Sequence, residues 1–322
     1  MGLFTGKVVV VTGAGSGLGR EYALTFASHG ASVVVNDYGA AVTAEKLATN
    51  PADDVVAEIT ALGGAAVANT ASVSDWLGAE SIIETAVTHF GRLDAVVNNA
   101  GNNRPSSLVE LSELDLDSQI DVHLKGTLAV SHFAAQHWNK VGAEIDRAIV
   151  NTTSAVGLHP TAGGGVYGAA KAGIAAATVS HAQELARLGV KVNALAPCAR
   201  TRMVKESPSV LAMMPESNEF DRHAPEHNAP LVAYLASSLN RFTGRIFAVE
   251  GPDLAIYTPF SVEEHWSTQG AWTVEGIAQT LQSVNERAET EAFFPGGVVQ
   301  HGVPSGRTLK MLSDVADSSK QS

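Results

Sequence analysis

Runs of consecutive apolar residues recur along the first 250 residues, and stretches of helical length separate them. The runs do not alternate apolar with polar positions, which is typical of strands buried on both faces of a parallel sheet. The expected strands are residues 8–11, 32–36, 65–69, 95–98, 148–152, 191–195 and 246–249, and the expected helices are residues 20–29, 55–62, 79–90, 120–138, 167–188 and 231–237. This alternation predicts an α/β fold with a doubly wound parallel sheet.

The strand-rich pattern ends near Glu250. Beyond it, residues 274–288 form an amphipathic helical pattern, and the polar C-terminal end is expected to be frayed. We therefore predict a Rossmann-type domain over residues 1–250 and a partly helical C-terminal extension over residues 251–322. A stretch rich in proline and methionine, residues 199–230, lacks a clear period and is predicted to be a mobile lid.

A glycine-rich turn directly follows the first expected strand, with the sequence Thr12-Gly13-Ala14-Gly15-Ser16-Gly17-Leu18-Gly19. Glycine permits unusual backbone angles and lets the backbone approach a pyrophosphate closely. The helix that follows presents free N–H groups and the positive end of its dipole. The spacing departs from the G-x-G-x-x-G pattern, because Leu18 occupies the position of its last glycine. The turn predicts a dinucleotide site, and its strand–turn–helix context disfavours a merely tight turn.

Asp37 ends the second expected strand, about 20 residues beyond the glycines. A carboxylate there accepts hydrogen bonds from the adenosine ribose 2′-hydroxyl and would repel a 2′-phosphate. The next residue is Tyr38, so no arginine adjoins Asp37 to bind that phosphate. The pattern therefore favours NAD over NADP, and a plain turn residue is the weaker interpretation.

Tyr167 and Lys171 lie four residues apart at the start of an expected helix, so their side chains share one face. A nearby ammonium group, and the positive nicotinamide ring of NAD⁺, favour the phenolate form of the tyrosine. Such a phenolate can take the proton of an alcohol while hydride leaves for the cofactor. Ser154 follows a strand end, and its hydroxyl could hold the substrate oxygen. These three residues are the predicted catalytic group.

Charge and cysteine content exclude several classes of protein. The net charge is −12, which argues against nucleic-acid binding, because that function needs basic patches. Cys198 is the single cysteine, so neither an intrachain disulfide nor a Cys/His zinc cluster is expected, and no metal is predicted. No apolar run is long enough to span a membrane. We therefore expect the protein to be cytoplasmic. We expect it to bind a small-molecule substrate.

The motifs together resemble those of the short-chain dehydrogenase/reductase family, whose members depend on a nicotinamide cofactor. Six segments match in order over about residues 4–250: Thr12–Gly19, Asp37, Asn98–Gly101, Ser154, Tyr167–Lys171 and Asn193–Pro197. Within the family the chain looks most like the dehydrogenase unit of peroxisomal multifunctional enzyme type 2 and related bacterial hydroxysteroid dehydrogenases. The segments behind this are Val35–Asp37, Val122–Gly126, Thr201–Met203 and Ala229–Val232. That resemblance implies oxidation of 3-hydroxyacyl-CoA thioesters or steroid alcohols with NAD⁺.

The resemblance also implies roles for single residues. Asn99, Ala100 and Gly101 would border the adenosine ribose. Lys171 and Tyr167 would contact the nicotinamide side of the cofactor, with Lys171 bonded to its ribose. The cofactor carboxamide would face the segment from Pro197 to Thr201, and the adenine would face Ser72 and Val73.

Three positions depart from the family's pattern. His123 stands where the family usually has asparagine in its N-x-x-G helix motif, so it is either a proton relay or a buried structural histidine. Cys198 replaces the usual glycine after Pro197 and is expected to be a packing residue rather than a nucleophile. Ser72 stands where the family often has aspartate against adenine, which weakens one adenine contact.

Two other functions stay open beside NAD-dependent oxidation. One is an NAD(P)H-dependent carbonyl reductase, and the other is a non-catalytic NAD-sensing protein on the same fold. The intact Ser154, Tyr167 and Lys171 set disfavours the sensor.

Small residues are frequent on two of the expected helices, which bears on assembly. They are Gly168, Ala169, Ala170, Ala172, Gly173, Ala175, Ala176 and Ala177 on one helix, and Gly126, Ala129, Ala134 and Ala135 on the other. Small residues allow close helix approach, and in the resembling family these two helices form a four-helix dimer interface. A homodimer or homotetramer is therefore predicted, and inward packing on the sheet is the alternative.

Overall fold

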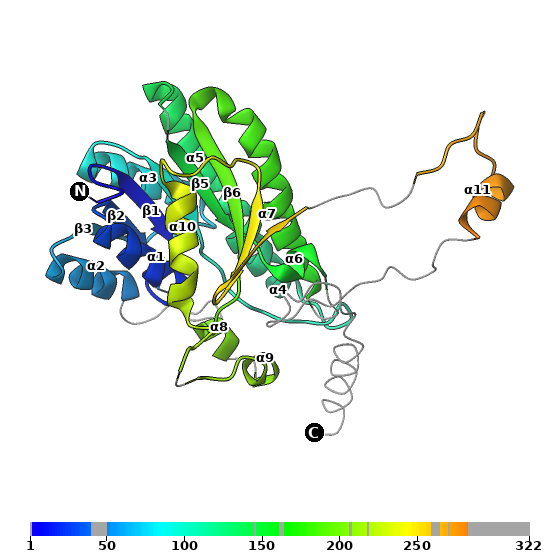
Figure 1. Cartoon of the computed structure of the whole chain (residues 1–322), viewed down its shortest axis with the longest axis horizontal. Helices are drawn as coiled ribbons and strands as arrows, with labels where there is room; N and C mark the ends of the chain where they lie inside the picture. Colours follow the sequence, from blue (N-terminus) through cyan, green and yellow to red (C-terminus); the bar gives the residue numbers. More distant parts are fainter. Residues whose placement is uncertain are drawn as a thin grey trace.

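Figure 1 shows the computed structural model of the chain, which describes residues 2–39, 50–144, 146–160, 164–205, 208–217, 219–258, 265–269 and 271–282. Its centre is one eight-stranded sheet with the strand order β3-β2-β1-β4-β5-β6-β7-β8. The strands are β1 Val8–Thr12, β2 Ser32–Asn36, β3 Ala65–Asn69, β4 Ala95–Asn98, β5 Arg147–Thr152, β6 Val190–Pro197, β7 Ile246–Glu250 and β8 Asp253–Tyr257.

The first seven strands pair in parallel, and β8 pairs antiparallel with β7. The predicted doubly wound α/β fold is confirmed. Strand order reverses between β1 and β4, because β2 and β3 lie on one side of β1 and the later strands lie beyond β4. The carboxyl ends of the strands at such a reversal leave a crevice that is the usual ligand site of this fold.

Helices cover both faces of the sheet (Figure 1). They are α1 Gly17–Ser28, α2 Pro51–Ala61, α3 Trp76–Phe90, α4 Glu113–Gln119, the π-helical η1 Ile120–Lys125, α5 Gly126–Val141, α6 Ala155–Leu158, α7 Gly165–Glu184, the 3₁₀ turns η2 Ala186–Leu188 and η3 Pro225–Asn228, α8 Arg202–Lys205, α9 Pro208–Ala212, α10 Ala229–Ala236 and α11 Val274–Leu281. None of these described helices is long and apolar enough to cross a lipid bilayer.

The two faces of the sheet form separate hydrophobic clusters, which explains the unbroken apolar runs of the sequence. Val9 and Val11 pack with residues of α1, α2 and α10, whereas Val8 and Val10 pack with residues of α3 and α5. Successive residues of a strand point to opposite faces. Since helices cover both faces, residues 8–11 of β1 are all apolar.

Several elements differ from the sequence prediction, which did not include the short helices α6, α8 and α9. Strand β8 lies beyond Glu250, where the strand-rich pattern was expected to end. Its apolar Leu254 and Ile256 are exposed, so its pattern does not show an apolar buried face. The long helix predicted over residues 120–138 is a continuous helical segment from Glu113 to Val141 that contains the π-helical turn η1. Part of the predicted helix over residues 274–288 lies outside the described residues.

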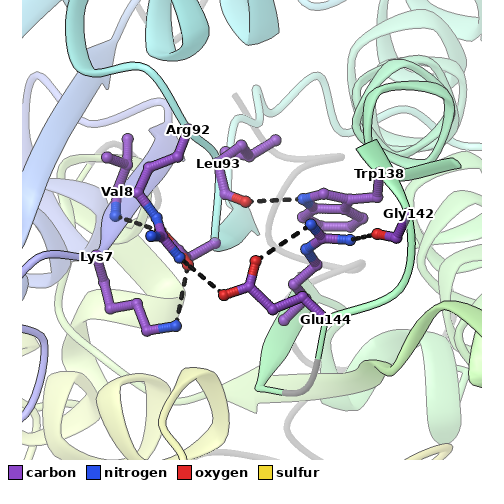
Figure 2. Close-up of polar contacts among 9 residues, drawn as sticks. Lys7, Val8, Arg92, Leu93, Trp138, Gly142 and Glu144 are labelled. Atoms are coloured by element: carbon purple, nitrogen blue, oxygen red, sulfur yellow. Dashed lines mark hydrogen bonds and ion pairs between the residues drawn. The ribbon is translucent and has the colours of Figure 1, made fainter. Parts of the chain in front are cut away.

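The buried carboxylate of Asp94 joins the amino ends of β1 and β4, at the edge opposite the crevice. Figure 2 shows Lys7, Val8 and Arg92, which donate hydrogen bonds to it. Asp94 accepts hydrogen bonds from Arg92, from the Val8 N–H at 2.8 Å and from Lys7 Nζ at 3.1 Å. Burial alone would raise the pKa of this carboxyl, but these donors outweigh burial and hold the pKa below its ordinary value. The network joins the amino ends of β1 and β4 and stabilises the sheet there.

Asp94→Asn is expected to lower the free energy of unfolding at neutral pH by about 1.5–3 kcal/mol, because charge-assisted hydrogen bonds are lost. The folded pKa lies below the unfolded one, so the stabilisation is present above the unfolded pKa. It is lost as the pH falls through the folded pKa. Urea unfolding of both proteins at neutral pH and in acid measures this, and an equal difference at both pH values would contradict the assignment.

Candidate active site

The glycine turn between β1 and α1 lies against the carboxyl end of β4. Gly13 and Gly17 have φ angles of +63° and +54°, a region that favours glycine. A Cβ atom at Gly13 would lie 2.7 Å from Ala100 Cα, and one at Gly19 would lie 2.2 Å from the Gly13 carbonyl oxygen. Side chains are therefore excluded at these positions, and the backbone itself forms this wall of the crevice.

Asn99 holds the turn in place. Its Nδ2 donates to the carbonyl oxygens of Thr12 at 3.0 Å and Gly13 at 3.2 Å. The backbone N–H groups of Asn99 and Ala100 in turn donate to Thr12 Oγ1, at 3.0 and 3.1 Å. These four bonds tie β1 to β4 at the crevice. Asn99 therefore has a structural task beside its predicted place at the ribose.

Asp37 ties the end of β2 to the same turn. Its Oδ2 accepts the Gly15 N–H at 2.9 Å, and its Oδ1 accepts the Gly39 N–H at 2.8 Å. The residue is half-buried and lines the crevice. Each carboxylate oxygen keeps acceptor capacity beyond its one backbone bond. Asp37 can therefore position the turn and also accept a ribose hydroxyl.

The crevice opens into a cavity of about 820 Å³. It is lined by all but one of the predicted site residues, namely Gly13, Ser16, Gly17, Leu18, Gly19, Asp37, Ser72, Val73, Asn99, Ala100, Gly101, His123, Ser154, Tyr167, Lys171, Pro197 and Thr201. Gly15 is the exception among the predicted residues, because it does not line the cavity. A Cβ there would lie 2.8 Å from Asp37 Oδ2, so Gly15 lets that carboxylate approach the backbone.

Lys171 lies on α7 at the floor of the cavity and is 3% exposed. Its Nζ donates to the Thr152 carbonyl oxygen at 2.7 Å and lies 5.6 Å from the centre of the Tyr167 ring. Burial lowers the pKa of Lys171 to about 7. The ammonium form is therefore poised near neutral pH, beside the phenol that it is expected to influence.

Tyr167 and Ser154 face one another across the cavity wall formed by α7 and α6. Burial raises the pKa of the Tyr167 phenol, and a side-chain hydrogen bond with Ser154 opposes that rise. Ser154 is the N-cap of α6, where its Oγ accepts the Val156 N–H at 3.3 Å. In the cofactor-free chain the phenol is therefore a proton donor. A positive charge beside it would be needed to favour the phenolate.

His123 lies in the π-helical turn η1 and is 1% exposed. Its Nε2 lies 2.9 Å from the Asn102 carbonyl oxygen, and we assign the proton to that nitrogen because this is the shorter of its two contacts with Asn102. The ring meets that of Tyr167 edge to face, with centres 5.2 Å apart. Burial, with the charge of Lys171, lowers the pKa of His123 to about 3. The imidazole is therefore neutral at physiological pH.

Comparison with known sequences agrees with this geometry. The sequence model of the short chain dehydrogenase family matches residues 7–210. The chain belongs to the short chain dehydrogenase family.

Relatives of this dehydrogenase act in several settings. The chain is 36% identical over 299 residues to the hydroxyacyl-CoA dehydrogenase ChsB1 of Mycobacterium tuberculosis. The match covers 90% of this chain and 92% of ChsB1. The chain is 43% identical over 233 residues to peroxisomal multifunctional enzyme type 2 of Drosophila melanogaster, over 72% of this chain but only 37% of that enzyme. A short chain dehydrogenase from Mycobacterium avium is 41% identical in its crystal structure, with a TM-score of 0.76 over 87% of this chain and 94% of that one.

The dehydrogenase is thus an oxidoreductase that acts on CH–OH groups, as its family membership and named relatives show. Family membership also brings a nicotinamide cofactor.

Three site features of the dehydrogenase escaped the sequence analysis. Asn102 binds His123, the Thr152 carbonyl oxygen binds Lys171, and Tyr257 lines the cavity from strand β8. The first two act through backbone oxygens, which carry no residue-type signal. Tyr257 lies on β8, a strand that the apolar pattern of the sequence does not predict.

Cys198 lines the same cavity and is 8% exposed. Burial, with the charge of Glu250, raises the pKa of its thiol to about 12. The thiol keeps its proton, which agrees with the prediction that it is not a nucleophile.

Proposed function

We propose that this chain is an NAD-dependent oxidoreductase that transfers a hydride between a secondary alcohol or its ketone and nicotinamide. The observation that carries the proposal is the meeting of Tyr167, Lys171 and Ser154 in one cavity with the glycine turn and Asp37. The first three supply acid–base chemistry, and the last two supply a nucleotide site.

The residues present fit a dinucleotide. The backbone of the glycine turn leaves room that a Cβ would fill, as Gly13 and Gly19 show. Ser16, the N-cap of α1, makes no side-chain capping bond, and the first turn of α1 carries no acidic residue. The N–H groups at this helix end therefore suit a pyrophosphate, and the adjacent carboxylate of Asp37 suits a ribose hydroxyl.

The catalytic residues would divide the work between them. Nicotinamide, when bound, accepts or donates the hydride. Ser154 Oγ holds the substrate oxygen, and Tyr167 Oη takes its proton in oxidation or returns it in reduction. Lys171, bonded to the Thr152 carbonyl, lies beside the Tyr167 ring and favours the phenolate when it carries a charge. His123 stays neutral and packs against Tyr167, so we give it a positioning role.

The substrate is proposed to be a 3-hydroxyacyl-CoA or a hydroxysteroid-type alcohol. A relative named as a hydroxyacyl-CoA dehydrogenase supports the first class. The cavity of about 820 Å³ is at the upper end of the range of ligand sites. The cytoplasmic location stays a prediction of the sequence.

A turnover assay tests this function. The purified chain is given NAD⁺ or NADP⁺ with a panel of 3-hydroxyacyl-CoA esters, hydroxysteroids and short secondary alcohols, and reduced cofactor is followed by absorbance. Oxidation of one of the first two classes with NAD⁺ is expected. Reduction of ketones with NADPH alone would favour a carbonyl reductase. Binding of NAD without turnover of any substrate would favour a sensor.

NAD(H) is expected to be preferred over NADP(H), because the Asp37 carboxylate would repel the 2′-phosphate. Asp37→Asn removes the charge and keeps one oxygen for the backbone bonds, so it should narrow the preference at least about tenfold. Asp37→Ala should narrow it too, and should also weaken NAD binding, because the Gly15 and Gly39 N–H groups lose their acceptor. The measurement is kcat/KM with both cofactors. A wild-type preference for NADPH refutes the assignment.

We propose a homodimer or homotetramer held by α7 and its neighbour α5. On α7, Ala169 and Ala176 are exposed and Ala172 is half-buried, which leaves a smooth outer face. On α5, in contrast, Gly126, Ala129 and Ala134 are buried within the chain, so the small residues that support the proposed interface are those of α7.

Ala176→Glu is expected to dissociate the assembly, because it places a charge on the close-packed face. Ala57→Glu, at an exposed alanine of α2, is the matched control and should leave the mass unchanged. Light scattering gives the mass directly. A wild-type species of 33.4 kDa at micromolar concentration, which is the mass of one chain, contradicts the prediction.

A further inference from the structure

Three metal-ligating side chains meet beneath the cavity, apart from the catalytic group. Cys198 follows the end of β6, His223 precedes the turn η3, and Glu250 ends β7. All three are buried, with exposed fractions of 8%, 6% and 0%. Their sulfur, imidazole and carboxylate atoms all lie within 4.8 Å of one another.

Backbone hydrogen bonds hold the segments that carry these side chains. The Cys198 N–H donates to the Val249 carbonyl oxygen at 3.1 Å, which joins the ends of β6 and β7. The Arg200 N–H donates to the His223 carbonyl oxygen at 2.7 Å, which joins the third segment to the same place. The three side chains are thus presented by a connected framework.

Several polar atoms of the cluster lack a hydrogen-bond partner among the described residues. They are Glu250 Oε2 and both ring nitrogens of His223. His223 Nε2 lies 3.3 Å from Glu250 Oε1, without the geometry of a hydrogen bond. Buried polar groups without partners destabilise the folded chain, so a ligand that satisfies them is favoured.

We propose that Cys198, His223 and Glu250 bind a divalent transition-metal ion of the zinc class. A thiolate, an imidazole and a carboxylate are all ligands that zinc accepts. Three points within 4.8 Å of one another share a centre no farther than about 2.8 Å from each, which is that separation divided by the square root of three. Zinc bonds are about 2.0–2.3 Å long, so small side-chain movements complete the site.

Arg222 supports this assignment from outside the cluster. Its Nε donates to Glu250 Oε1 at 3.0 Å, so Oε1 is fixed and Oε2 is left for the ion. Hydrogen bonds of this kind orient metal-binding carboxylates. Binding of the ion displaces the thiol proton of Cys198 to solvent, so the two positive charges of the ion are balanced by the Cys198 thiolate and the Glu250 carboxylate. A single cysteine argues against a cluster built from several cysteines. It does not exclude a mixed site in which one cysteine, one histidine and one glutamate come from three distant segments.

The site would face the substrate. Cys198 lines the cavity together with Ala248 and Tyr257. A zinc ion with three protein ligands has one further coordination position, which in this place suits a water molecule or a substrate oxygen. The inference does not rest on the proposed function, because hydride transfer needs no metal.

Cobalt(II) is a suitable probe, because it occupies zinc sites and its bond to a thiolate gives an intense near-ultraviolet charge-transfer band. The full chain, freed of any affinity tag and treated with a chelator, is titrated with Co²⁺ and then with Zn²⁺. Because Cys198 is the single cysteine, any such band reports this residue. We expect one equivalent of Co²⁺ to produce the band and one equivalent of Zn²⁺ to abolish it. Absence of the band in the folded wild-type chain overturns the proposal, and the cluster is then a histidine–glutamate ion pair.

Variants separate the ligands from their surroundings. Cys198→Ser and Glu250→Gln should lose stoichiometric binding of Zn²⁺, measured by competition with a chelating dye. Arg222→Lys should weaken Zn²⁺ binding by about 10–100-fold, as expected for a residue that orients a ligand. His227→Gln is the matched control for His223→Gln. His227 Nε2 binds the Asp221 carbonyl oxygen outside the cluster, so this variant should bind Zn²⁺ like the wild type. Equal Zn²⁺ affinity in the His223→Gln and His227→Gln variants overturns the assignment of His223.

Discussion

Tyr167→Phe is expected to lower kcat by about 10²–10⁴-fold and to leave NAD binding nearly intact. The variant keeps the ring that packs against His123 at a centre distance of 5.2 Å, so the cavity wall is unchanged. It loses only the hydroxyl, which hydrogen-bonds with Ser154 and which we propose exchanges a proton with the substrate. The expected fall in kcat would therefore reflect the loss of acid–base catalysis and not a change in packing.

Tyr22→Phe is the matched control for this prediction. Tyr22 is fully buried in α1, and its hydroxyl has no hydrogen-bond partner among the described residues. It does not line the cavity. Loss of the Tyr22 hydroxyl should therefore leave kcat unchanged. Steady-state kinetics and a fluorescence titration with NADH measure both proteins, and an unaltered kcat in Tyr167→Phe would remove that residue from the mechanism.

The parallel sheet could be predicted because its signal is local and repeated. Each inner strand is a short apolar run, such as Val8–Thr12, and both of its faces meet helices. The glycine turn was equally clear, because positive φ angles at Gly13 and Gly17 and close contacts at Gly19 admit no other residue. Where steric demands act on residues close in sequence, residue type alone identifies the structure.

What escaped prediction depends on contacts between distant segments. Strand β8 exposes Leu254 and Ile256, so the usual rule for buried faces fails there. The π-helical turn at His123 belongs to a helix whose sequence shows only an ordinary helical pattern. The hydrogen bond from the Gly15 N–H to Asp37 joins the glycine turn to β2, and the residue type alone does not indicate it. The meeting of Cys198 with Glu250 follows from the pairing of β6 with β7, which no local pattern encodes.

Lys171→Met is expected to weaken the binding of NAD⁺ and to slow the chemical step. The lysine Nζ is bonded to the Thr152 carbonyl oxygen at 2.7 Å and lies beside the Tyr167 ring, within the cavity that would hold the nicotinamide ribose. Loss of the charge should lower kcat by about 10²-fold, and loss of a charge-assisted hydrogen bond should raise the KM for NAD⁺ about tenfold. Lys191→Met, at a lysine of β6 bonded to the Asn240 carbonyl oxygen outside the cavity, is the kinetic control.

The same lysine should make the stability of the cofactor-free chain depend on pH. Burial lowers the pKa of Lys171 from its ordinary 10.5 to about 7. Between these two values the unfolded chain binds the proton that the folded chain has released, so the free energy of unfolding rises with pH. Relative to Lys171→Met, the wild type should gain about 2 kcal/mol from about pH 7 to 9, because one pKa unit corresponds to about 1.4 kcal/mol. Below about pH 7 both states hold the proton and the penalty for burying the charge is complete. Urea unfolding of the two proteins across this range measures the difference, and a difference that stays constant with pH would show that Lys171 keeps its charge in the folded chain.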